Sequence, residues 1–215
     1  RGRLDARRTL KSLVADLRFK TILSKLYHWK IYVVGSVEYQ YPNHLFQAGY
    51  FLDKKYYDEN TIDFKHLLLS EKNQSLLKDI QNSNSVGVHI RRGDYMTKQN
   101  LVIFGNICTQ KYYHDAIRII TEKVNDAVFY VFSDDISWVQ THLDIPNAVY
   151  VNWNTGESSI YDMYLMSSCK YNIIANSTFS YWAARLNKKT NMVIYPSKWY
   201  NTFTPDIFPE SWCGI

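Results

Sequence analysis

Apolar runs alternate with segments of helical spacing throughout the second half of the chain. The apolar runs cover residues 86–90, 127–132, 148–151, 171–175 and 192–195, and the segments of helical character cover residues 110–124, 135–143, 158–168 and 179–186. Strands that are apolar on both faces and alternate with helices are typical of a parallel sheet covered by helices. The pattern therefore predicts an α/β fold for this part of the chain.

The first part of the chain has a less regular pattern. Residues 31–84 contain short apolar runs and many tyrosines, and no motif in them indicates a chemistry. The length of the chain allows one large domain or two modest ones, and the pattern becomes regular only from Val86 onward.

The positive charge is concentrated at the amino end. Residues 1–30 carry nine Lys or Arg against Asp5 and Asp16, a balance of +7, whereas the whole chain carries +5. Leucines, isoleucine and valine recur there at helical spacing, which predicts one or two basic amphipathic helices. Such a helix either contacts an anionic membrane or covers the core of its own domain, and the second arrangement is the more common one.

Composition excludes several classes of protein. With 46% hydrophobic residues in 215, the chain can bury a core and is not disordered. Its three cysteines are widely spaced and form no C-x-x-C pair, which indicates a reducing compartment and neither a disulfide framework nor a zinc site. No apolar run reaches the length of a membrane span, and no signal-peptide pattern is present. Because the first residue is Arg, we expect the natural amino terminus to be missing.

Polar residues follow four of the predicted strands. They are residues 89–95, 133–135, 152–154 and 176–180. Right-handed crossovers place the carboxyl ends of parallel strands along one edge of the sheet, so these residues should lie at the same edge. Open α/β sheets bind ligands there, with phosphate at a helix amino terminus and the base or ribose on a carboxylate. The pattern predicts a nucleotide site.

Two adjacent arginines, Arg91 and Arg92, directly follow the first of these strands. Arginine stays protonated and offers a planar fork of donors, so the pair can neutralise a diphosphate without a metal ion. An alternative is that both arginines form surface salt bridges, one of them with Asp94. The triplet Arg92-Gly93-Asp94 also matches a cell-adhesion tripeptide, but it follows a strand and lacks the flexible loop that adhesion needs.

Each of the other polar residues has an ordinary structural role as an alternative. Asp134 or Asp135, and Ser177, Thr178 or Ser180, can cap the helices that follow them, and His89 can be a core histidine. Their grouping at one edge favours the site. The chain has no G-x-G-x-x-G and no Walker loop, which disfavours hydride transfer and ordinary NTP hydrolysis.

Three blocks resemble, in order and spacing, the motifs of the bacterial α-1,2-fucosyltransferases, glycosyltransferase family 11. They are His-Ile-Arg-Arg-Gly-Asp-Tyr at 89–95, Phe-Ser-Asp-Asp at 132–135 and Ala-Asn-Ser-Thr-Phe-Ser-Tyr-Trp-Ala-Ala at 175–184. The segment Tyr-Pro-Ser-Lys-Trp-Tyr at 195–200 resembles the closing segment of the family. The clear resemblance covers residues 86–200.

The resemblance implies a GT-B architecture, in which a Rossmann-like parallel sheet flanked by helices is joined to a second, N-terminal domain on the acceptor side. It implies GDP-fucose as donor, a galactose-containing oligosaccharide as acceptor, inversion at the anomeric carbon, and no metal or other cofactor. Residues 85–215 would then bind GDP-fucose, and residues 1–84 would be part of the acceptor domain.

The resemblance also assigns roles to residues. Arg91 would bind the β-phosphate, Arg92 would support it through Asp94, and His89 would lie beside the guanine nucleotide. Asp135, or alternatively Asp134, would read guanine. The stretch at the start of the last helix would hold the phosphates, namely Asn176, Ser177, Thr178, Phe179 and Ser180.

The chain departs from the family in its first part. The Gly-Gly-x-Gly-Asn-Gln-type loop of the acceptor domain does not occur here. Either the chain starts inside that domain or it is a diverged member, and Arg1 together with the short first domain favours the former. Asp94 is the nearest candidate for a general base, with an arginine partner as its alternative role.

Other functions stay open on the sequence alone. One is a non-catalytic domain that binds nucleotides or polyanions, and another is a protein O-fucosyltransferase. For the enzyme we expect no nucleic-acid partner and a cytoplasmic location in a bacterium, with peripheral contact to the inner membrane through residues 1–30.

Overall fold

The computed structural model describes residues 25, 32–34, 46–48 and 62–215. The chain divides into two compact units, Arg1–Tyr57 and Asp58–Ile215. In the first unit, strands β1 (Tyr32–Val34) and β2 (Phe46–Ala48) pair in parallel, with Tyr32 opposite Phe46. Apart from Lys25, which is helical, the basic helices predicted over residues 1–30 lie outside the described residues.

The second unit is built on a six-stranded sheet of order β5-β4-β3-β6-β7-β8, in which all neighbours are parallel. The strands are β3 (Asn84–Ile90), β4 (Ala127–Ser133), β5 (Ala148–Val151), β6 (Tyr171–Ile173), β7 (Met192–Tyr195) and β8 (Cys213–Gly214). This confirms the predicted α/β class and the five predicted strands. The short strand β8 was not predicted, because two residues give no period.

Strand β6 ends two residues before the predicted end at Ala175. The backbone N–H of Ile174 still reaches Ile194 O at 2.9 Å, but that of Ala175 turns to the Ser180 hydroxyl at 3.2 Å. Ile174 and Ala175 are fully buried, so their apolar character reflects burial beyond the strand.

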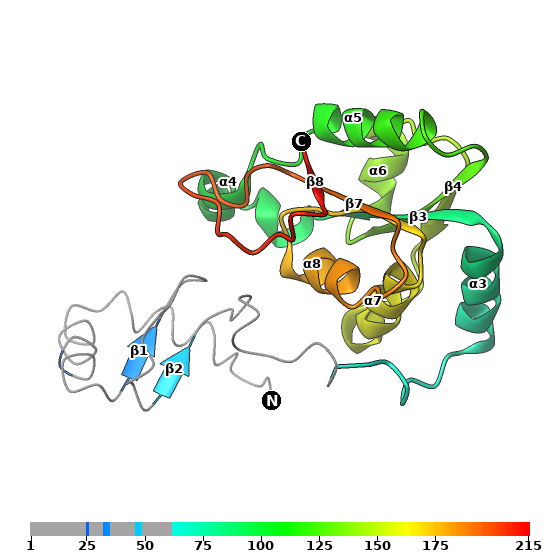
Figure 1. Cartoon of the computed structure of the whole chain (residues 1–215). Coiled ribbons are helices and arrows are strands. Elements are labelled where there is room, and N and C mark those ends of the chain that lie inside the picture. The colour runs from blue at the N-terminus through cyan, green and yellow to red at the C-terminus, as the bar shows by residue number, and fades with distance from the viewer. Residues whose placement is uncertain (1–24, 26–31, 35–45, 49–61) are drawn as a thin grey trace. The chain divides into compact units, whose positions relative to one another are not determined.

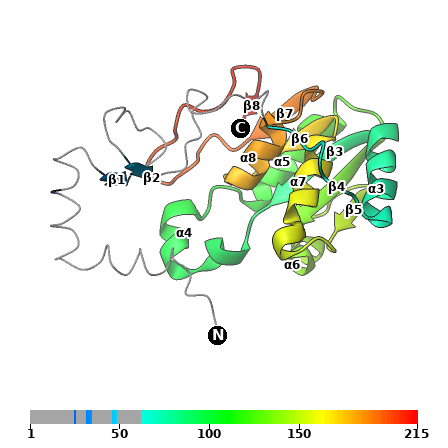
Figure 2. The same cartoon turned by 90° about the horizontal axis from the view of Figure 1, so that it is seen from below.

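Helices cover both faces of the sheet (Figures 1 and 2). Helices α5 (Gln110–Thr121) and α6 (Ile136–His142) lie on one face, and α3 (Glu71–Asn82), α7 (Ser159–Ser167) and α8 (Thr178–Arg185) lie on the other. Short 3₁₀ turns, η3 (Gly93–Met96) and η4 (Gly156–Ser158), and helix α4 (Lys98–Phe104) follow strand ends. Helices α3 and α4 were not predicted; α3 presents few apolar residues to the core, and the Ser70 hydroxyl caps it by accepting from Asn73 N.

Alternate residues of the central strands supply two separate cores. In β3, Val86, Val88 and Ile90 pack with α5 and α6, whereas the intervening His89 faces α8, with its ring beside Phe179. In β4, Phe129 belongs to the first core and Phe132 to the second. Successive residues of a strand therefore pack into opposite cores, one on each face of the sheet.

The division between the units falls before α3, not at the predicted boundary of 84 and 85. Leu76 and Ile80 of α3 are buried in the core beneath the sheet, and α3 packs against β3 and α7. Helix α3 therefore belongs to the C-terminal unit. The assignment of the two parts to acceptor and donor binding stays a prediction. Within the described parts of the chain, no helix is long and apolar enough to cross a membrane.

Candidate functional site

Arg91 immediately follows β3 and binds two carboxylates at once. Its Nη2 lies 2.6 Å from Asp94 Oδ1, and its Nη1 lies 2.7 Å from Asp134 Oδ2. The Arg91 side chain is 33% exposed, so the guanidinium stays accessible from solvent. Residues from two neighbouring strand ends thus converge on one positive charge.

Arg92 is held in a different way. Its Nε donates to Asp135 Oδ2 at 3.2 Å, and its Cζ lies 3.6 Å from the centroid of the Trp138 ring. The Trp138 ring in turn stacks on His142, with centroids 4.5 Å apart. A carboxylate and an aromatic face together fix the guanidinium of Arg92.

The expected support of Arg92 through Asp94 is therefore wrong. The η3 turn begins at Gly93 and brings Asp94, three residues after Arg91, onto the Arg91 guanidinium. Arg92 points toward the loop after β4 and pairs with Asp135 instead. Consecutive residues that leave a strand point in opposite directions, which separates the two partners.

Both carboxylates after β4 have protein partners. Asp134 Oδ1 accepts from the backbone N–H of Arg92 at 2.9 Å, in addition to its ion pair with Arg91. Asp135 Oδ1 accepts from Trp138 N at 3.1 Å and so caps α6, which confirms the capping alternative for Asp135. Whether either residue reads guanine stays a prediction.

Gly93 is required by the close approach of these loops. A Cβ atom added at Gly93 would collide with the Asp134 carboxylate, which has no room to retreat without losing its bonds to Arg91 and Arg92. The glycine of the Arg-Arg-Gly-Asp motif thus lets the loop after β3 contact the loop after β4.

His89 lies behind the arginines and is 6% exposed. Burial, with a smaller contribution from the Arg91 charge, lowers the pKa of His89 to about 3. Its Nδ1 is buried and has no hydrogen-bond partner among the described residues, and its ring lies 5.1 Å from that of Phe179. His89 is therefore a neutral, buried ring, and its place beside a nucleotide stays a prediction.

Asn176 and Ser180 hold the turn between β6 and α8 from inside. The Asn176 amide donates to Trp199 O at 3.0 Å, and its Oδ1 accepts from the Cys108 thiol at 3.3 Å. The Ser180 hydroxyl accepts from Ala175 N. Both side chains are almost fully buried, at 2% and 0% exposure, so their observed role is to shape the loop.

Ser177, Thr178 and Phe179 form the rest of this turn, and Ser177 is buried as well. Ser177 occupies the N-cap position of α8, but its side chain makes no capping hydrogen bond, so the capping alternative is wrong for Ser177. Thr178 and Phe179 are partly buried. Helix α8 follows β6, and β6 is the neighbour of β3 in the sheet. The amino end of α8 therefore lies at the same edge of the sheet as Arg91, which follows β3.

Tyr95 and Trp138 are structural parts of the site: Tyr95 ends the first motif block but had no predicted role, and the sequence analysis missed Trp138. The Tyr95 hydroxyl donates to Asn176 O at 2.9 Å, so it joins the loop after β3 to the loop after β6. Trp138 lies three residues after Asp135, the cap of α6, and so in the first turn of the helix. This spacing from the end of β4 is the sequence feature that could have identified it. Trp138 lies outside the three motif blocks.

The residues after β5 form a separate polar network. Asn154 exchanges hydrogen bonds with Asn73 of α3 at 3.0 and 3.1 Å and donates to Asp162 Oδ1 at 2.7 Å, while the Trp153 indole N–H donates to Asn73 at 2.7 Å. Burial raises the pKa of Asp162 to about 7. This network joins α3, β5 and α7, and Asn73 and Asp162 belong to helices that no motif identified.

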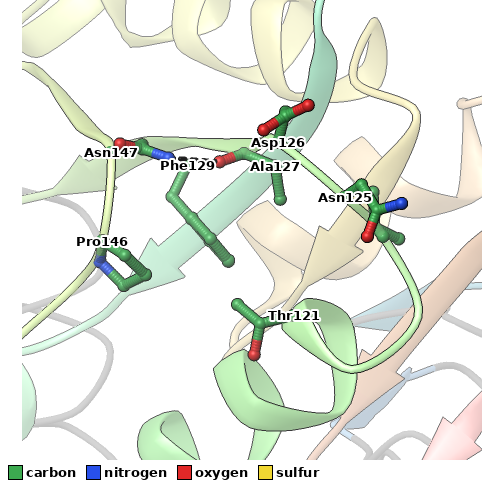
Figure 3. A pocket seen from close by; sticks show the side chains of 8 residues that line it. Thr121, Asn125, Asp126, Ala127, Phe129, Pro146 and Asn147 are labelled. Atoms are coloured by element: carbon green, nitrogen blue, oxygen red, sulfur yellow. Dashed lines mark hydrogen bonds between the residues drawn. The ribbon is translucent and has the colours of Figure 1, made fainter.

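The described part of the chain also has a surface pocket of about 450 Å³, at the opposite edge of the sheet. It is lined near the start of β4 by Asn125, Asp126 and Ala127, and Asn147 and Pro146 line its other side (Figure 3). Asp126 and Asn147 both adopt positive φ, 51° and 46°. The arginines lie at the carboxyl ends of the strands, so this pocket is no part of the candidate site.

The arginine edge has the chemistry of an anion site. Among residues 62–215 and the short described segments, no group of three or more His, Cys, Asp or Glu is placed to hold a metal ion. Asp94, Asp134 and Asp135 bind arginines instead. Two fixed guanidinium groups beside a helix amino end can bind a polyanion such as a diphosphate.

The similar proteins found by comparison are named as sugar transferases. The chain is 35% identical over 196 residues to the alpha-1,2-colitosyltransferase of Escherichia coli, a match that covers 84% of this chain and 63% of that protein. It is 44% identical over 122 residues to the O-antigen biosynthesis glycosyltransferase WbnK of Escherichia coli, covering 56% of this chain and 40% of WbnK. The galactoside alpha-(1,2)-fucosyltransferase 2 of Pongo pygmaeus is 28% identical over 163 residues, a match that covers 70% of this chain and 48% of that protein.

A similar solved structure is that of the fucosyltransferase NodZ from Bradyrhizobium. It has a TM-score of 0.39 and 16% identity, and the match covers 55% of this chain and 40% of NodZ. The chain thus spans between 40% and 63% of the length of these relatives.

The family model described as "Glycosyl transferase family 11" matches residues 3–215, which is nearly the whole chain. The matched range includes all three motif blocks on which the resemblance was founded, and the relatives are named as glycosyltransferases. The chain therefore belongs to glycosyl transferase family 11.

Proposed function

We propose that this chain carries the donor-binding part of a GT-B glycosyltransferase. The enzyme would move L-fucose from GDP-fucose to the 2-hydroxyl of a galactose in a surface glycan, with inversion at the anomeric carbon. The observation that carries the proposal is Arg91, an accessible guanidinium at the carboxyl edge of a parallel sheet, in a family-11 motif.

The chemistry of the transfer needs such a group. When the bond between fucose and phosphate breaks, the sugar gains oxocarbenium character and negative charge accumulates on GDP. A fixed donor aimed at the departing diphosphate lowers this barrier, and it does so most effectively when its position is set in advance. The Asp134 carboxylate, which also accepts from the backbone N–H of Arg92, holds the Arg91 guanidinium in position.

Arg92 would add a second positive charge without moving. Its contacts with Asp135 and Trp138 occupy Nε and one face of the guanidinium. Its Nη groups have no hydrogen-bond partner among the residues that the structure describes, and they would bind a phosphate. Thr178 and Phe179 at the start of α8 would contribute backbone N–H groups to the same anion, whereas the N–H of Ser177 already donates to Ala175 O at 2.7 Å.

Guanine recognition is proposed for Asp135 or Asp134. Each carboxylate already accepts from the protein, so a base would share it with the present donors. A carboxylate oxygen has more than one acceptor position, which permits this sharing. His89, neutral and buried, would pack near the nucleotide without carrying charge.

The relatives favour one second candidate for the donor sugar. The relative with 35% identity is named a colitosyltransferase, whereas others are named fucosyltransferases. Transfer of colitose from its nucleotide-activated form is therefore the alternative, with the same anion site. Location in the bacterial cytoplasm, with residues 1–30 against the inner membrane, and independence of metal ions belong to this proposal.

Thermal unfolding of the chain with GDP, ADP and UDP tests donor recognition. A nucleotide that binds only the folded state raises the unfolding temperature, and at equal concentration the nucleotide that binds more tightly raises it further. We expect GDP to raise it most. Equal, salt-sensitive stabilisation by all three nucleotides and by heparin would favour a non-catalytic polyanion binder instead.

Product analysis tests the reaction. A protein that spans the full length of the relatives would be incubated with GDP-fucose or activated colitose and a set of β-galactosides, with EDTA present or absent. We expect an α-1,2-linked product from one donor, unaffected by EDTA. Fucose on a protein hydroxyl would instead support the O-fucosyltransferase alternative.

A further inference from the structure

We propose that Asp94 is a built-in competitor for the anion that Arg91 binds. Its carboxylate occupies one side of the Arg91 guanidinium, and a diphosphate must displace it. The inference rests on the proposed function, in which that diphosphate belongs to the nucleotide-sugar donor and to the departing GDP.

The charges around Arg91 make displacement necessary. Both terminal nitrogens of its guanidinium are paired, one with Asp94 at 2.6 Å and the other with Asp134 at 2.7 Å. One positive charge thus faces two negative ones. A diphosphate that approaches this group is repelled unless a carboxylate moves away, because charges a few ångströms apart interact strongly.

Asp94 is the carboxylate that can move. Its side chain is 57% exposed, against 27% for Asp134. Asp134 also accepts from the backbone N–H of Arg92 at 2.9 Å, whereas the Asp94 carboxylate has no further hydrogen-bond partner in the part of the chain that the structure describes. Asp134 therefore holds Arg91 in place while Asp94 leaves.

Movement of the Asp94 side chain requires no unfolding of its turn. The backbone carbonyl of Asp94 accepts from the Asn100 amide at 2.8 Å and from Thr97 N at 3.3 Å, which fixes the main chain of η3. Rotation about the Asp94 side-chain bonds alone opens the pair. Ion pairs with a largely exposed partner add little stability, so this opening is easy.

The exchange between Asp94 and a diphosphate would act both when the donor binds and when GDP is released. On binding, the diphosphate replaces the Asp94 carboxylate at Arg91. After transfer, the returning carboxylate competes with the diphosphate of GDP and so speeds product release. Asp94 would then limit product affinity, a role distinct from that of a general base, which would leave the affinity for a diphosphate unchanged.

Titration calorimetry with inorganic pyrophosphate tests the inference on the 215-residue chain. We expect Asp94→Asn to bind pyrophosphate roughly 2- to 5-fold more tightly than the unmodified chain, on the scale of a partly exposed charge pair. Asp134→Asn should bind it about tenfold more weakly, because Arg91 and the Arg92 backbone lose their common anchor. Arg91→Ala should show no measurable binding.

The matched control is Asp115→Asn. Asp115 lies on α5, where it pairs with Lys111, and its replacement changes the net charge by the same amount as Asp94→Asn. It should leave pyrophosphate affinity unchanged. Circular dichroism of each variant checks that the fold is retained.

Several outcomes overturn the inference. Unchanged or weaker binding by a folded Asp94→Asn variant would show that Asp94 helps to position Arg91 or serves another role. An equal gain in Asp115→Asn would reduce the effect to net charge, and absence of pyrophosphate binding in every variant would remove the anion site. Failure of GDP to stabilise the chain more than ADP or UDP refutes only the guanine donor, since pyrophosphate carries no base.

Discussion

The guanidinium carbon of Arg92 lies 3.6 Å from the centroid of the Trp138 indole, while Arg92 Nε donates to Asp135 at the start of the same helix. Helix α6 thus supplies both the carboxylate and the ring that hold Arg92. The second arginine of the motif depends for its position on a residue outside the motif.

Replacement of Trp138 should therefore weaken nucleotide binding without removing any charge. We expect Trp138→Ala to lower the affinity for GDP by about 3- to 30-fold, the range for loss of a cation–π contact at a partly buried site. Trp138→Phe should retain most of the affinity, because a ring face remains. Calorimetric titration of the three proteins measures this, and equal loss in both variants would contradict the role of the aromatic face.

Arg91 should matter for the rate of transfer. In a protein that spans the full length of its relatives, Arg91→Ala should lower turnover on the order of 10²- to 10³-fold, the scale for removal of one charge-stabilising donor. Arg91→Lys should recover only part of this, because a single ammonium cannot replace the planar fork that binds Asp134 and a phosphate together. Near-normal turnover by a folded Arg91→Ala variant would refute the proposed site.

Gly93 should tolerate no side chain. Gly93→Ala places a methyl group against the Asp134 carboxylate, so the loops after β3 and β4 must separate. We expect loss of pyrophosphate binding together with a lower unfolding temperature. Gly156→Ala is the matched control, since its Cβ meets no atom within 4 Å, although its φ of 60° makes some loss of stability expected there as well. Retained pyrophosphate affinity in Gly93→Ala would show that the close approach is dispensable.

The raised pKa of Asp162, about 7 against an ordinary value of 3.8, has a consequence for stability. Between these values the folded state holds a proton that the unfolded state has lost, so this group's contribution falls as the pH rises from about 4 to 7, by about 1.4 kcal/mol per pH unit at most. We expect Asp162→Asn to be more stable than the unmodified chain at pH 8 and similar at pH 4. The amide oxygen still accepts from Asn154.

Urea denaturation of both proteins at pH 4, 5, 6, 7 and 8 measures this difference. Asp206→Asn, which replaces an exposed carboxylate, is the control and should leave the profile unchanged. A constant difference between Asp162→Asn and the unmodified chain across the pH range would contradict the proposed titration.

His89 should act in the opposite direction. Its pKa is lowered to about 3 in the folded state, so between about pH 6.5 and 3 the unfolded state binds a proton that the folded state excludes. Stability from His89 is therefore full above pH 6.5 and is lost as the pH falls. We expect His89→Gln to remove this loss of stability at low pH. In Asp162→Asn the opposing effect of Asp162 is absent, so the loss due to His89 should be seen more clearly in the same urea series.

The sequence by itself determined the parallel α/β class, the alternation of strands and helices along the chain and the edge at which the polar residues gather. These features depend on local periods and on the right-handed crossover, which are properties of short segments. The motif blocks around Arg91, Asp134 and Ser177 also identified the family, because family motifs are contiguous in the chain.

Only the tertiary structure decided which partner each charged group takes. Arg92 meets Asp135 across a separation of 43 residues, and Asn73 meets Asn154 across 81, contacts that no period or motif specifies. The same packing turned Asn176 and Ser180 inward and placed α3 with the C-terminal unit. Burial and the distance between charges depend on how the layers pack, so the roles of Trp138 and Asp162 became visible only in the folded molecule.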